Sequence, residues 1–283
     1  MRILAIACQT NTQWRCKIQR GVPEKLFRMN WLLVALYVLA GLLILSLMTW
    51  AIVASTSRHK TSTIASLPTT VPYNDAFGDR QQMQLQRMHV SRPSVYVIRD
   101  FLSPAEVEHL LGISRGRGER SRVKSSDGTS VVSPIRTSTS ATLQAHEDEV
   151  VTAVERRAAD LVGLPVSHVE DLQVVDYDPG QYYRPHQDAF AARSNTVKRH
   201  GNRRYTILAY LSTQEHPGAG GETKFTRIGL KVPPQAGTAI LWDNLKKNSL
   251  DSDPMSMHTA LPLKEGHKTA VNIWLRTRPQ RLS

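Results

Sequence analysis

Residues 180–190 read GQYYRPHQDAF and place His186 and Asp188 one residue apart at the end of a predicted β-strand. Side chains separated by one residue on a strand point to the same face of a sheet, so both can turn toward one centre. A pair of this kind also occurs as two surface polar residues. A metal site would therefore need a third ligand further along the chain.

Four histidines follow the pair, namely His200, His216, His258 and His267. His200 lies in the basic stretch VKRHGN and His216 lies beside Pro and Gly, which is typical of solvated loops. His258 precedes TALPLKEGHK, in which KEG can form the tip of a hairpin that brings Lys268 across from His258. A His-x-Asp pair with one distant His is the two-histidine, one-carboxylate pattern that leaves positions on Fe(II) open.

The segments around the pair predict an α+β domain. The stretch SPAEVEHLLGI begins with a helix N-cap signal, and EDEVVTAVERRAADLVGLP carries the apolar spacing of a second helix. The later strand-like runs are DLQVVDY, RYTILAYLS, TKFT, GTAILW and TAVNIWLR. Two helices and then many short strands, without alternating βα units, favour an antiparallel sandwich or barrel.

These stretches resemble prolyl 4-hydroxylases, members of the Fe(II)/2-oxoglutarate-dependent dioxygenases, from about Pro93 to Arg278. The matching stretches are FLSPAEVEHL, SPIRTSTSATL, VERRAADLVGLP, LQVVDYDPGQYYRPHQD, RYTILAYLS, GGETKF and MHTALPLKEGHKTAVNIWLR. The resemblance implies a double-stranded β-helix, a jelly-roll sandwich with flanking helices. Two positions depart from the family, which often has an aromatic residue in place of Gln187 and a tryptophan in place of Thr269.

The resemblance also implies the residues that hold iron and the co-substrate. The iron ligands would be His186, Asp188 and His258. Lys268 would pair with the distal carboxylate of 2-oxoglutarate, since a buried dicarboxylate needs a cation at its far end. Tyr177 and Thr223 would add hydroxyl hydrogen bonds to the same carboxylate, although packing roles fit them as well.

A second group of residues matches family positions that contact the peptide substrate. These residues are Tyr183, Arg203, Arg136 and Trp274. Arg204 is an equal alternative to Arg203, because loop length blurs the register. A solvated surface position is the competing interpretation for each arginine, and a plain core position is the competing interpretation for the tryptophan.

The N-terminal third predicts a membrane anchor. Residues 31–54, WLLVALYVLAGLLILSLMTWAIVA, are 24 residues without a charge, enough at about 1.5 Å each to cross a bilayer core of roughly 30 Å. Residues 1–30 are rich in Lys and Arg, which predicts a cytosolic tail and a lumenal C-terminal bulk. A cleaved signal peptide has a shorter apolar region that begins earlier. We expect a type II, single-pass protein of the endoplasmic reticulum or Golgi membrane.

The rest of the chain divides into a stalk and a catalytic domain. Residues 55–92 are rich in Ser, Thr and Gln, which favours a stalk with at most a short helix in its Gln-rich part. Residues 93–283 form the predicted dioxygenase domain. Both cysteines of the chain lie before residue 17, so this domain has no thiol for a disulfide or a zinc site.

Charge argues against a nucleic-acid partner. The chain carries a formal charge of +12, but residues 1–92 hold 11 Lys and Arg against three Asp and Glu, and the remainder holds 25 against 21. Most of the excess therefore lies outside the predicted catalytic domain.

We expect hydroxylation of peptidyl proline to 4-hydroxyproline in the secretory pathway, with Fe(II), O2 and 2-oxoglutarate, and a proline-containing polypeptide as substrate. The resemblance also implies ascorbate as the reductant of oxidised iron. One rival is a dioxygenase of the same fold that acts on another residue or substrate. Another is a membrane-tethered peptide-binding module without turnover, although binding alone would not require the three iron ligands and Lys268.

Overall fold

The computed structural model describes residues 39–42, 44, 67–89, 91–124 and 129–281. The chain divides into two compact units, residues 1–60 and residues 61–283. In the first unit, residues 39–42 and 44 are helical, and the predicted cytosolic tail and most of the predicted membrane anchor lie outside the described residues. A search of the described part of the chain finds no helix that is both long and apolar enough to span a membrane.

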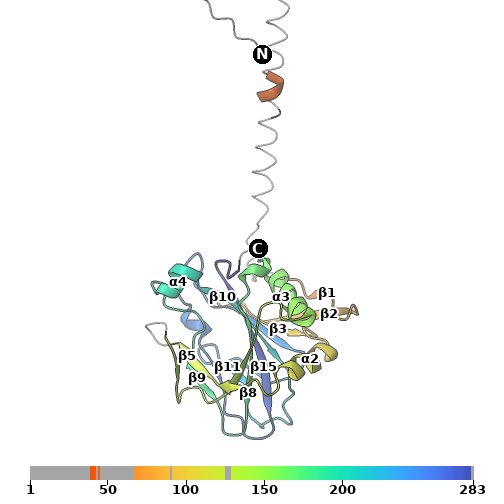
Figure 1. Ribbon diagram of the computed structural model, residues 1–283. Helices are drawn as coiled ribbons and strands as arrows, with labels where there is room; N and C mark the ends of the chain where they lie inside the picture. Colours follow the sequence, from red (N-terminus) through yellow and green to blue (C-terminus); the bar gives the residue numbers. More distant parts are fainter. Residues whose placement is uncertain (1–38, 43, 45–66, 90, 125–128, 282–283) are drawn as a thin grey trace, which may run out of the picture. The chain divides into compact units, whose positions relative to one another are not determined.

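The second unit is built on two antiparallel sheets (Figure 1). The strands of the large sheet, in spatial order, are β1 (Thr70–Asn74), β2 (Arg80–His89), β3 (Val95–Arg99), β13 (Ala239–Asp243), β10 (Arg203–Tyr210), β15 (Lys268–Arg276), β8 (Leu172–Tyr177), β7 (Thr139–Leu143) and β4 (Glu119–Arg120). The strands of the small sheet are β12 (Lys231–Val232), β11 (Thr223–Phe225), β14 (His258–Ala260) and β9 (Tyr183–His186). A separate hairpin joins β5 (Arg122–Lys124) to β6 (Ser130–Val132).

Strand β10 shows how the large sheet buries both of its faces. Ile207 and Ala209 belong to the core under the helices, whereas Leu208 and Tyr210 belong to a second core between the two sheets. Side chains alternate between the faces of a strand, so a strand covered on both sides reads as a continuous apolar run. Burial of both faces explains why RYTILAYLS is a nearly continuous apolar run, and the two packed sheets agree with the predicted sandwich.

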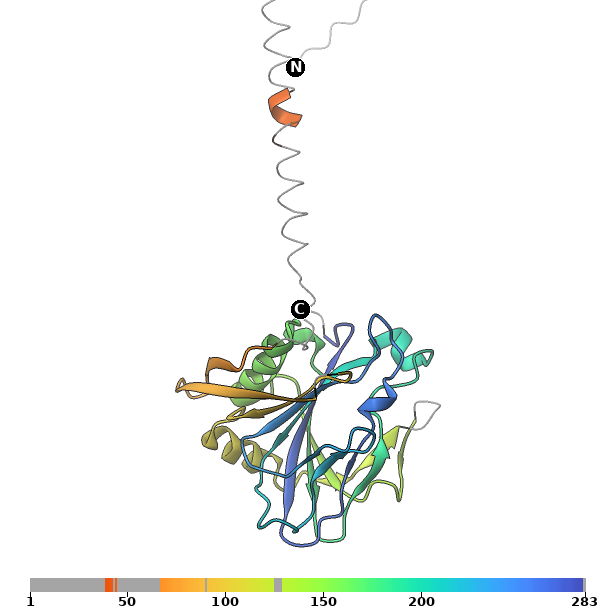
Figure 2. The same cartoon turned by 180° about the vertical axis from the view of Figure 1, so that it is seen from behind.

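Two helices cover the outer face of the large sheet (Figure 2). Helix α2 (Pro104–Ser114) begins with a capping box formed by Ser103 and Glu106. Helix α3 (Glu149–Val162) begins at the N-cap Asp148 and ends at Gly163, whose φ of 67° is readily adopted by glycine. The prediction of these two flanking helices is confirmed. The remaining helical segments are the short helix α4 (Asn195–His200) and the 3-10 turns η2 (Val166–His168) and η3 (Pro254–Ser256).

Strands β1 and β2 correct the predicted domain boundary. The stalk predicted for residues 55–92 is wrong for residues 70–89, because β2 pairs with β3 inside the large sheet, with Leu85 opposite Ile98. Met83 and Leu85 are 2% and 6% exposed in the core under the helices. The stretch QMQLQ alternates polar and apolar residues, which is a strand pattern. Pairing and burial outweigh the local preference for a helix in this Gln-rich stretch.

Candidate metal centre and co-substrate pocket

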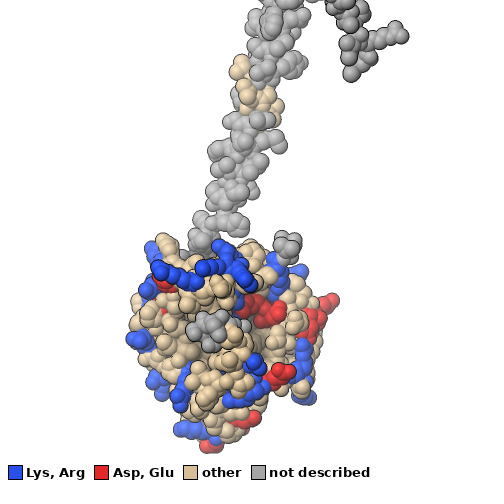
Figure 3. Space-filling view, turned by 60° about the vertical axis from the view of Figure 1, so that its left-hand side comes forward, with Lys and Arg blue, Asp and Glu red and all other residues tan. Residues whose placement is uncertain are grey.

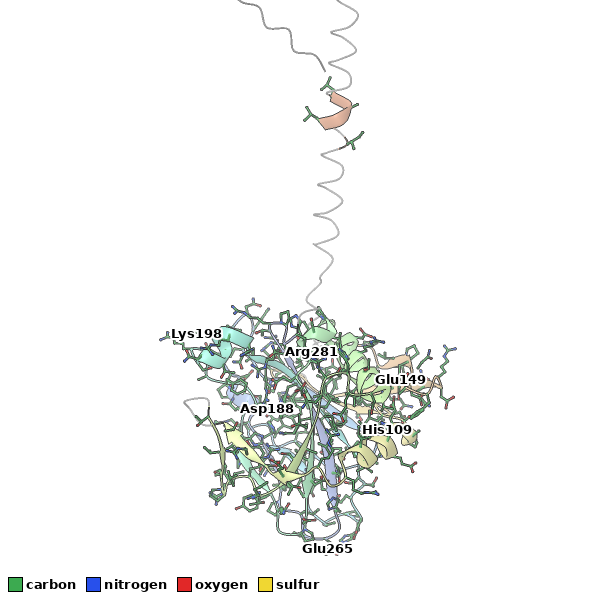
Figure 4. All side chains as sticks on the ribbon, in the orientation of Figure 1. His109, Glu149, Asp188, Lys198, Glu265 and Arg281 are labelled. Carbon is green, nitrogen blue, oxygen red and sulfur yellow. The ribbon has the colours of Figure 1, made fainter. Side chains whose placement is uncertain are left out.

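Three predicted ligands converge where β9 meets β14. His186, the last residue of β9, lies opposite His258, the first residue of β14, and Asp188 follows β9 by two residues. His186 Nε2 lies 3.7 Å from Asp188 Oδ1, and His258 Nε2 lies 3.8 Å from Asp188 Oδ2. The candidate ligand atoms all lie within 4.8 Å of one another. In the view of Figure 4, Asp188 is labelled near mid-height of the second unit and Glu265 at its lower edge.

Both imidazole rings are oriented by backbone carbonyl groups. Nδ1 of His186 lies 2.9 Å from the carbonyl oxygen of Arg184, and Nδ1 of His258 lies 3.0 Å from that of Ser256. A carbonyl oxygen only accepts, so each Nδ1 carries the proton and each Nε2 keeps a lone pair for a metal. This arrangement fixes which nitrogen of each ring is the ligand.

The protonation states also suit a metal centre. Burial, together with the charge of His258, lowers the pKa of His186 to about 3, so its imidazole is neutral at neutral pH. Burial alone would raise the pKa of Asp188, but the charges of His258 and His186 outweigh it and lower this pKa to about 2. The neutral imidazole of His186 and the ionised carboxylate of Asp188 are forms that bind a divalent cation. The donor set therefore fits Fe(II) with coordination positions left open.

All three ligands line a cavity of about 810 Å³, which lies between the two sheets and also reaches Lys268. Lys268 is the first residue of β15, pairs with Tyr177 of β8, and is 2% exposed. Its Nζ lies 5.0 Å from the Tyr177 ring centroid and 5.7 Å from that of Tyr210. Burial lowers the pKa of Lys268 to about 7, and the charge of Glu222 opposes this shift. No carboxylate of the described residues forms an ion pair with Lys268, so an anion in the cavity would compensate its charge.

The predicted hairpin between His258 and Lys268 is not formed. Strand β14 pairs with β11 and β9 in the small sheet, whereas β15 pairs with β10 and β8 in the large sheet. Residues 261–267 cross from one sheet to the other. The two side chains therefore reach the same cavity from opposite walls, which leaves space for a ligand between them.

Hydroxyl groups surround the lysine end of the cavity. Tyr177 and Thr223 both line the cavity and are 4% and 2% exposed. The Tyr210 hydroxyl lies 2.8 Å from Thr223 Oγ1 and 3.1 Å from the carbonyl oxygen of Val232. Tyr210 is a core residue that does not line the cavity, and it reaches the site through its hydrogen bond to Thr223.

The glycine pair of GGETKF lets two segments approach closely beside Lys268. A Cβ atom on Gly220 would lie 2.2 Å from the carbonyl oxygen of Pro262. A Cβ atom on Gly221 would lie 3.0 Å from Leu263 Cδ1 and 3.4 Å from Lys268 Cδ. Both glycines have positive φ, +83° and +79°, which side chains rarely tolerate. The pair thus keeps the slot open for the stem of the lysine.

Comparison with known proteins agrees with this geometry. Residues 172–276 match the family described as the 2OG-Fe(II) oxygenase superfamily. Probable prolyl 4-hydroxylase 8 of Arabidopsis thaliana is 31% identical over 245 residues, which cover 77% of this chain and 83% of that protein.

The chain belongs to the prolyl 4-hydroxylase family. Other relatives are covered less completely. Probable prolyl 4-hydroxylase 7 of Arabidopsis thaliana is 33% identical over 66% of this chain and 63% of its own length. Prolyl 4-hydroxylase subunit alpha-1 of Rattus norvegicus is 36% identical over 67% of this chain and 35% of its own length, so this chain spans about a third of that subunit.

A solved structure of the same family shares the fold. The viral collagen prolyl hydroxylase from Paramecium Bursaria Chlorella virus-1, solved as a complex with 2-oxoglutarate, is 26% identical to this chain with a TM-score of 0.52. The match covers 64% of this chain and 95% of that protein. The mostly antiparallel architecture is thus that of a 2OG-Fe(II) oxygenase and is consistent with a jelly roll.

The peptide-side residues predicted from the prolyl 4-hydroxylase resemblance lie next to the metal ligands. The Tyr183 ring stacks on the His186 ring with centroids 3.5 Å apart, and the Arg136 guanidinium carbon lies 4.9 Å from the Tyr183 centroid. Arg136 is 6% exposed and donates to Ser138 Oγ and Gln173 Oε1 at 3.1 and 3.0 Å. Burial raises the pKa of Tyr183 to about 12, so its phenol stays protonated.

The two arginines that the sequence left open differ in their position relative to the cavity. Arg203 lines the cavity, and its guanidinium carbon lies 3.5 Å from the centroid of the Trp274 ring. Arg204 pairs with Asp243 at 2.9 Å and is not among the residues that line the cavity. Trp274 also lines the cavity, and its buried indole nitrogen has no hydrogen-bond partner among the described residues.

Glu170 was not predicted, yet it holds Arg203 in place. Its two carboxylate oxygens accept hydrogen bonds from Arg203 Nε and Nη2 at 2.8 Å each, and Arg276 Nε donates to it at 2.6 Å. Burial alone would raise the pKa of Glu170, but the charges of Arg203 and Arg276 lower it to about 2. A single glutamate between the turn η2 and strand β8 carries no sequence signal, because its partners lie more than 30 residues away.

The two departures from the family pattern have local partners. The Gln187 side-chain amide donates to the carbonyl oxygen of Asp253 at 2.7 Å, and the Thr269 hydroxyl donates to Asp176 Oδ1 at 2.7 Å. With Gln187 and Thr269 at these positions, the three predicted iron ligands and Lys268 still line the cavity.

Proposed function

We propose that this protein is a 2-oxoglutarate-dependent prolyl 4-hydroxylase acting on proline-containing polypeptides. One observation carries the proposal: His186, Asp188 and His258 converge on the cavity whose opposite wall holds Lys268, a buried cation with no ion-pair partner among the described residues. A site that binds only a metal would not need Lys268. A dicarboxylate could bind the metal through one end and pair with Lys268 through its other carboxylate.

The residues of the cavity divide into separate tasks. Bound Fe(II) would supply open coordination positions for 2-oxoglutarate and O2. The three ligands would hold the metal from one side, where their side chains are only 7–15% exposed and so keep most of the solvent from that side. Lys268, with the hydroxyl groups of Tyr177 and Thr223, would fix the distal carboxylate and thereby orient the co-substrate.

A proline-containing peptide fits the wall formed by Tyr183, Arg136, Arg203 and Trp274. Aromatic rings offer flat apolar surface to a pyrrolidine ring. The unpartnered indole N–H of Trp274 and the guanidinium of Arg136 can donate to peptide carbonyl groups. Residues 93–283 hold 25 Lys and Arg against 21 Asp and Glu, and Figure 3 shows both signs of charge on one face, which supports a peptide rather than a nucleic acid as substrate.

We further propose that the catalytic domain lies in the lumen of the endoplasmic reticulum or Golgi, anchored by residues 31–54, and that ascorbate keeps its iron reduced. The uncharged length of that segment and the basic residues before it support this location. Protease treatment of sealed microsomes tests the orientation. The domain should resist digestion until detergent is added, and digestion without detergent would contradict the proposal.

Succinate release from 2-oxoglutarate tests the activity. We expect release with Fe(II) to increase when a proline-rich peptide is added, and not when its prolines are replaced by alanine. His186→Ala should abolish release while the protein stays folded, because the ligand lies at the edge of the core. Release that does not depend on proline would favour a dioxygenase acting on another substrate, and no release despite peptide binding would favour a binding module.

A further inference from the structure

A chain of buried polar groups leads from the interior of the large sheet to one metal ligand. The indole Nε1–H of Trp242 donates to Asn244 Oδ1 at 2.8 Å, and Asn244 Nδ2 donates to Thr206 Oγ1 at 2.7 Å. The Thr206 hydroxyl in turn donates to Asp188 Oδ2 at 2.7 Å. Thr206 and Asn244 are fully buried and Trp242 is 1% exposed. Buried polar groups with complete partners orient one another rigidly.

The donor at the start of the chain sets the direction of every hydrogen bond in it. An indole N–H only donates, so the oxygen of the Asn244 side chain faces Trp242 and its NH2 group faces Thr206. The Thr206 oxygen accepts that bond, and its own hydrogen is directed to Asp188, whose carboxylate only accepts. The four groups therefore have one consistent arrangement, which ends on a defined oxygen of the metal ligand.

Trp242 also contacts a second metal ligand. Its ring lies edge-on to the His258 ring with centroids 4.8 Å apart, and Phe225 lies against it at 5.2 Å. The pairing of β10 with β13 places Trp242 opposite Thr206, so this side chain and the polar chain come from adjacent strands. Trp242 thus contacts one ligand through its ring and reaches another through hydrogen bonds.

We propose that Thr206, Asn244 and Trp242 are positioning residues that set the orientation of the Asp188 carboxylate for metal binding. The inference rests on the proposed metal site but not on the identity of the substrate. Without the Thr206 hydrogen bond, Asp188 Oδ2 loses its donor and the carboxylate is free to turn away from the two imidazoles. Partners of this kind are typically worth about 10–100-fold in metal affinity.

Metal affinity of the full-length protein, measured by anaerobic equilibrium dialysis with Fe(II), tests the proposal without any turnover. Thr206→Val keeps the shape of the side chain but removes the hydroxyl, and it should weaken Fe(II) binding by about 10–100-fold. Thr206→Ser keeps the hydroxyl and should bind within a few-fold of the wild type. The absorption spectrum of bound Co(II) should change in Thr206→Val and stay unchanged in Thr206→Ser, since it reports ligand geometry.

A second pair of variants covers the case in which Thr206→Val fails to fold. Trp242→Phe keeps an aromatic ring beside His258 but removes the N–H donor, so it should also weaken Fe(II) binding. Combining it with Thr206→Val should add little, because both changes break one chain. Fully additive losses would overturn the shared chain. Equal affinity of wild type, Thr206→Val and Trp242→Phe would overturn the positioning role alone, whereas a wild type that binds no Fe(II) would overturn the metal site itself.

Discussion

Replacing Lys268 with methionine removes the charge at the far end of the cavity and keeps a side chain of similar length. The stem of Lys268 fills a tight slot, since a Cβ atom on Gly221 would lie only 3.4 Å from its Cδ. A smaller substitute would leave a void as well as remove a charge. Methionine therefore separates the loss of the cation from a loss of packing.

The expected loss of affinity follows from the burial of this lysine. Lys268 is 2% exposed and has no ion-pair partner among the described residues, so its removal leaves the distal carboxylate of 2-oxoglutarate uncompensated. An uncompensated buried charge typically costs about 3–5 kcal/mol. At about 1.4 kcal/mol per tenfold, the affinity for 2-oxoglutarate should fall by roughly 100-fold or more.

The pH dependence of wild-type binding provides a second measure of the same group. Burial lowers the pKa of Lys268 to about 7, with Glu222 opposing the shift, and the other titratable groups facing it are the Tyr177 and Tyr210 phenols. The ammonium is present below this pKa and is lost as pH rises. Affinity for 2-oxoglutarate should therefore fall by about tenfold per pH unit above 7. Lys268→Arg should bind less tightly at neutral pH but lose little affinity between pH 7 and 9, since a guanidinium stays charged.

Lys268→Met should stabilise the ligand-free protein. A lowered folded-state pKa means that the unfolded chain binds more protons between about pH 7 and 10.5, so burying Lys268 destabilises the fold most at and below pH 7. Lys268→Met should then raise the free energy of unfolding by a few kcal/mol at neutral pH, on the order of the pKa shift. Opposite effects on stability and ligand affinity are typical of a functional charge.

Anaerobic calorimetric titration of 2-oxoglutarate into the Fe(II)-loaded variants is the assay. Fe(II) affinity should stay near the wild-type value, because the metal ligands lie on the opposite wall of the cavity. Unchanged 2-oxoglutarate affinity in Lys268→Met would refute the assignment. Arg276 does not offer a ready substitute, since it donates to Glu170 at 2.6 Å.

Three further predictions concern stability, and denaturant or thermal unfolding checks each of them. Glu170→Gln should destabilise the protein by about 3 kcal/mol at pH 7, because the pKa of Glu170 falls from 4.5 to about 2 in the fold. Because this pKa is lowered, the stabilisation by ionised Glu170 is fully present above about pH 4.5 and is lost as pH falls toward 2. The difference in free energy of unfolding between wild type and Glu170→Gln should vanish over the same range, and a difference that stays constant would contradict the ion-pair explanation. Gly220→Ala should cost more than Gly218→Ala, since both have positive φ but only Gly220 faces a backbone atom, at 2.2 Å; equal costs would rule out the close approach. A protein that begins at residue 93 should be less stable than one that begins at residue 67 by about 3–6 kcal/mol, because it lacks the buried Met83 and Leu85; equal stability would restore the predicted boundary.

The sequence predicted the parts of the site that depend on local pattern. The one-residue spacing on a strand places His186 and Asp188 on the same side, and the motif match identified His258 and Lys268. The structure brings all four to one cavity. What the sequence missed depends on pairing between distant strands, and Glu170 reaches its arginine partners only because β10 and β15 are neighbours.

Two predictions about the fold were wrong because both relied on local features of the sequence. The residues KEG suggested a hairpin, but the segment after His258 changes sheets, and no local signal distinguishes a hairpin tip from a crossing. The Gln-rich residues of β2 look polar on average, although Met83 and Leu85 alternate with glutamines and pack in the core under the helices. Average composition hides a period of two, so the pairing of β2 with β3 could be found only by testing for alternation.

We propose that the three metal ligands and Lys268 form one oxygenase site that modifies proline. Incubation with Fe(II), 2-oxoglutarate, ascorbate and a proline-rich peptide under 18O-labelled O2, followed by mass spectrometry of peptide and succinate, tests it most directly. We expect one labelled oxygen atom on C4 of proline and one in succinate, with neither product formed by His258→Ala. Labelled succinate with unmodified proline, or hydroxyproline formed without 2-oxoglutarate, would contradict it.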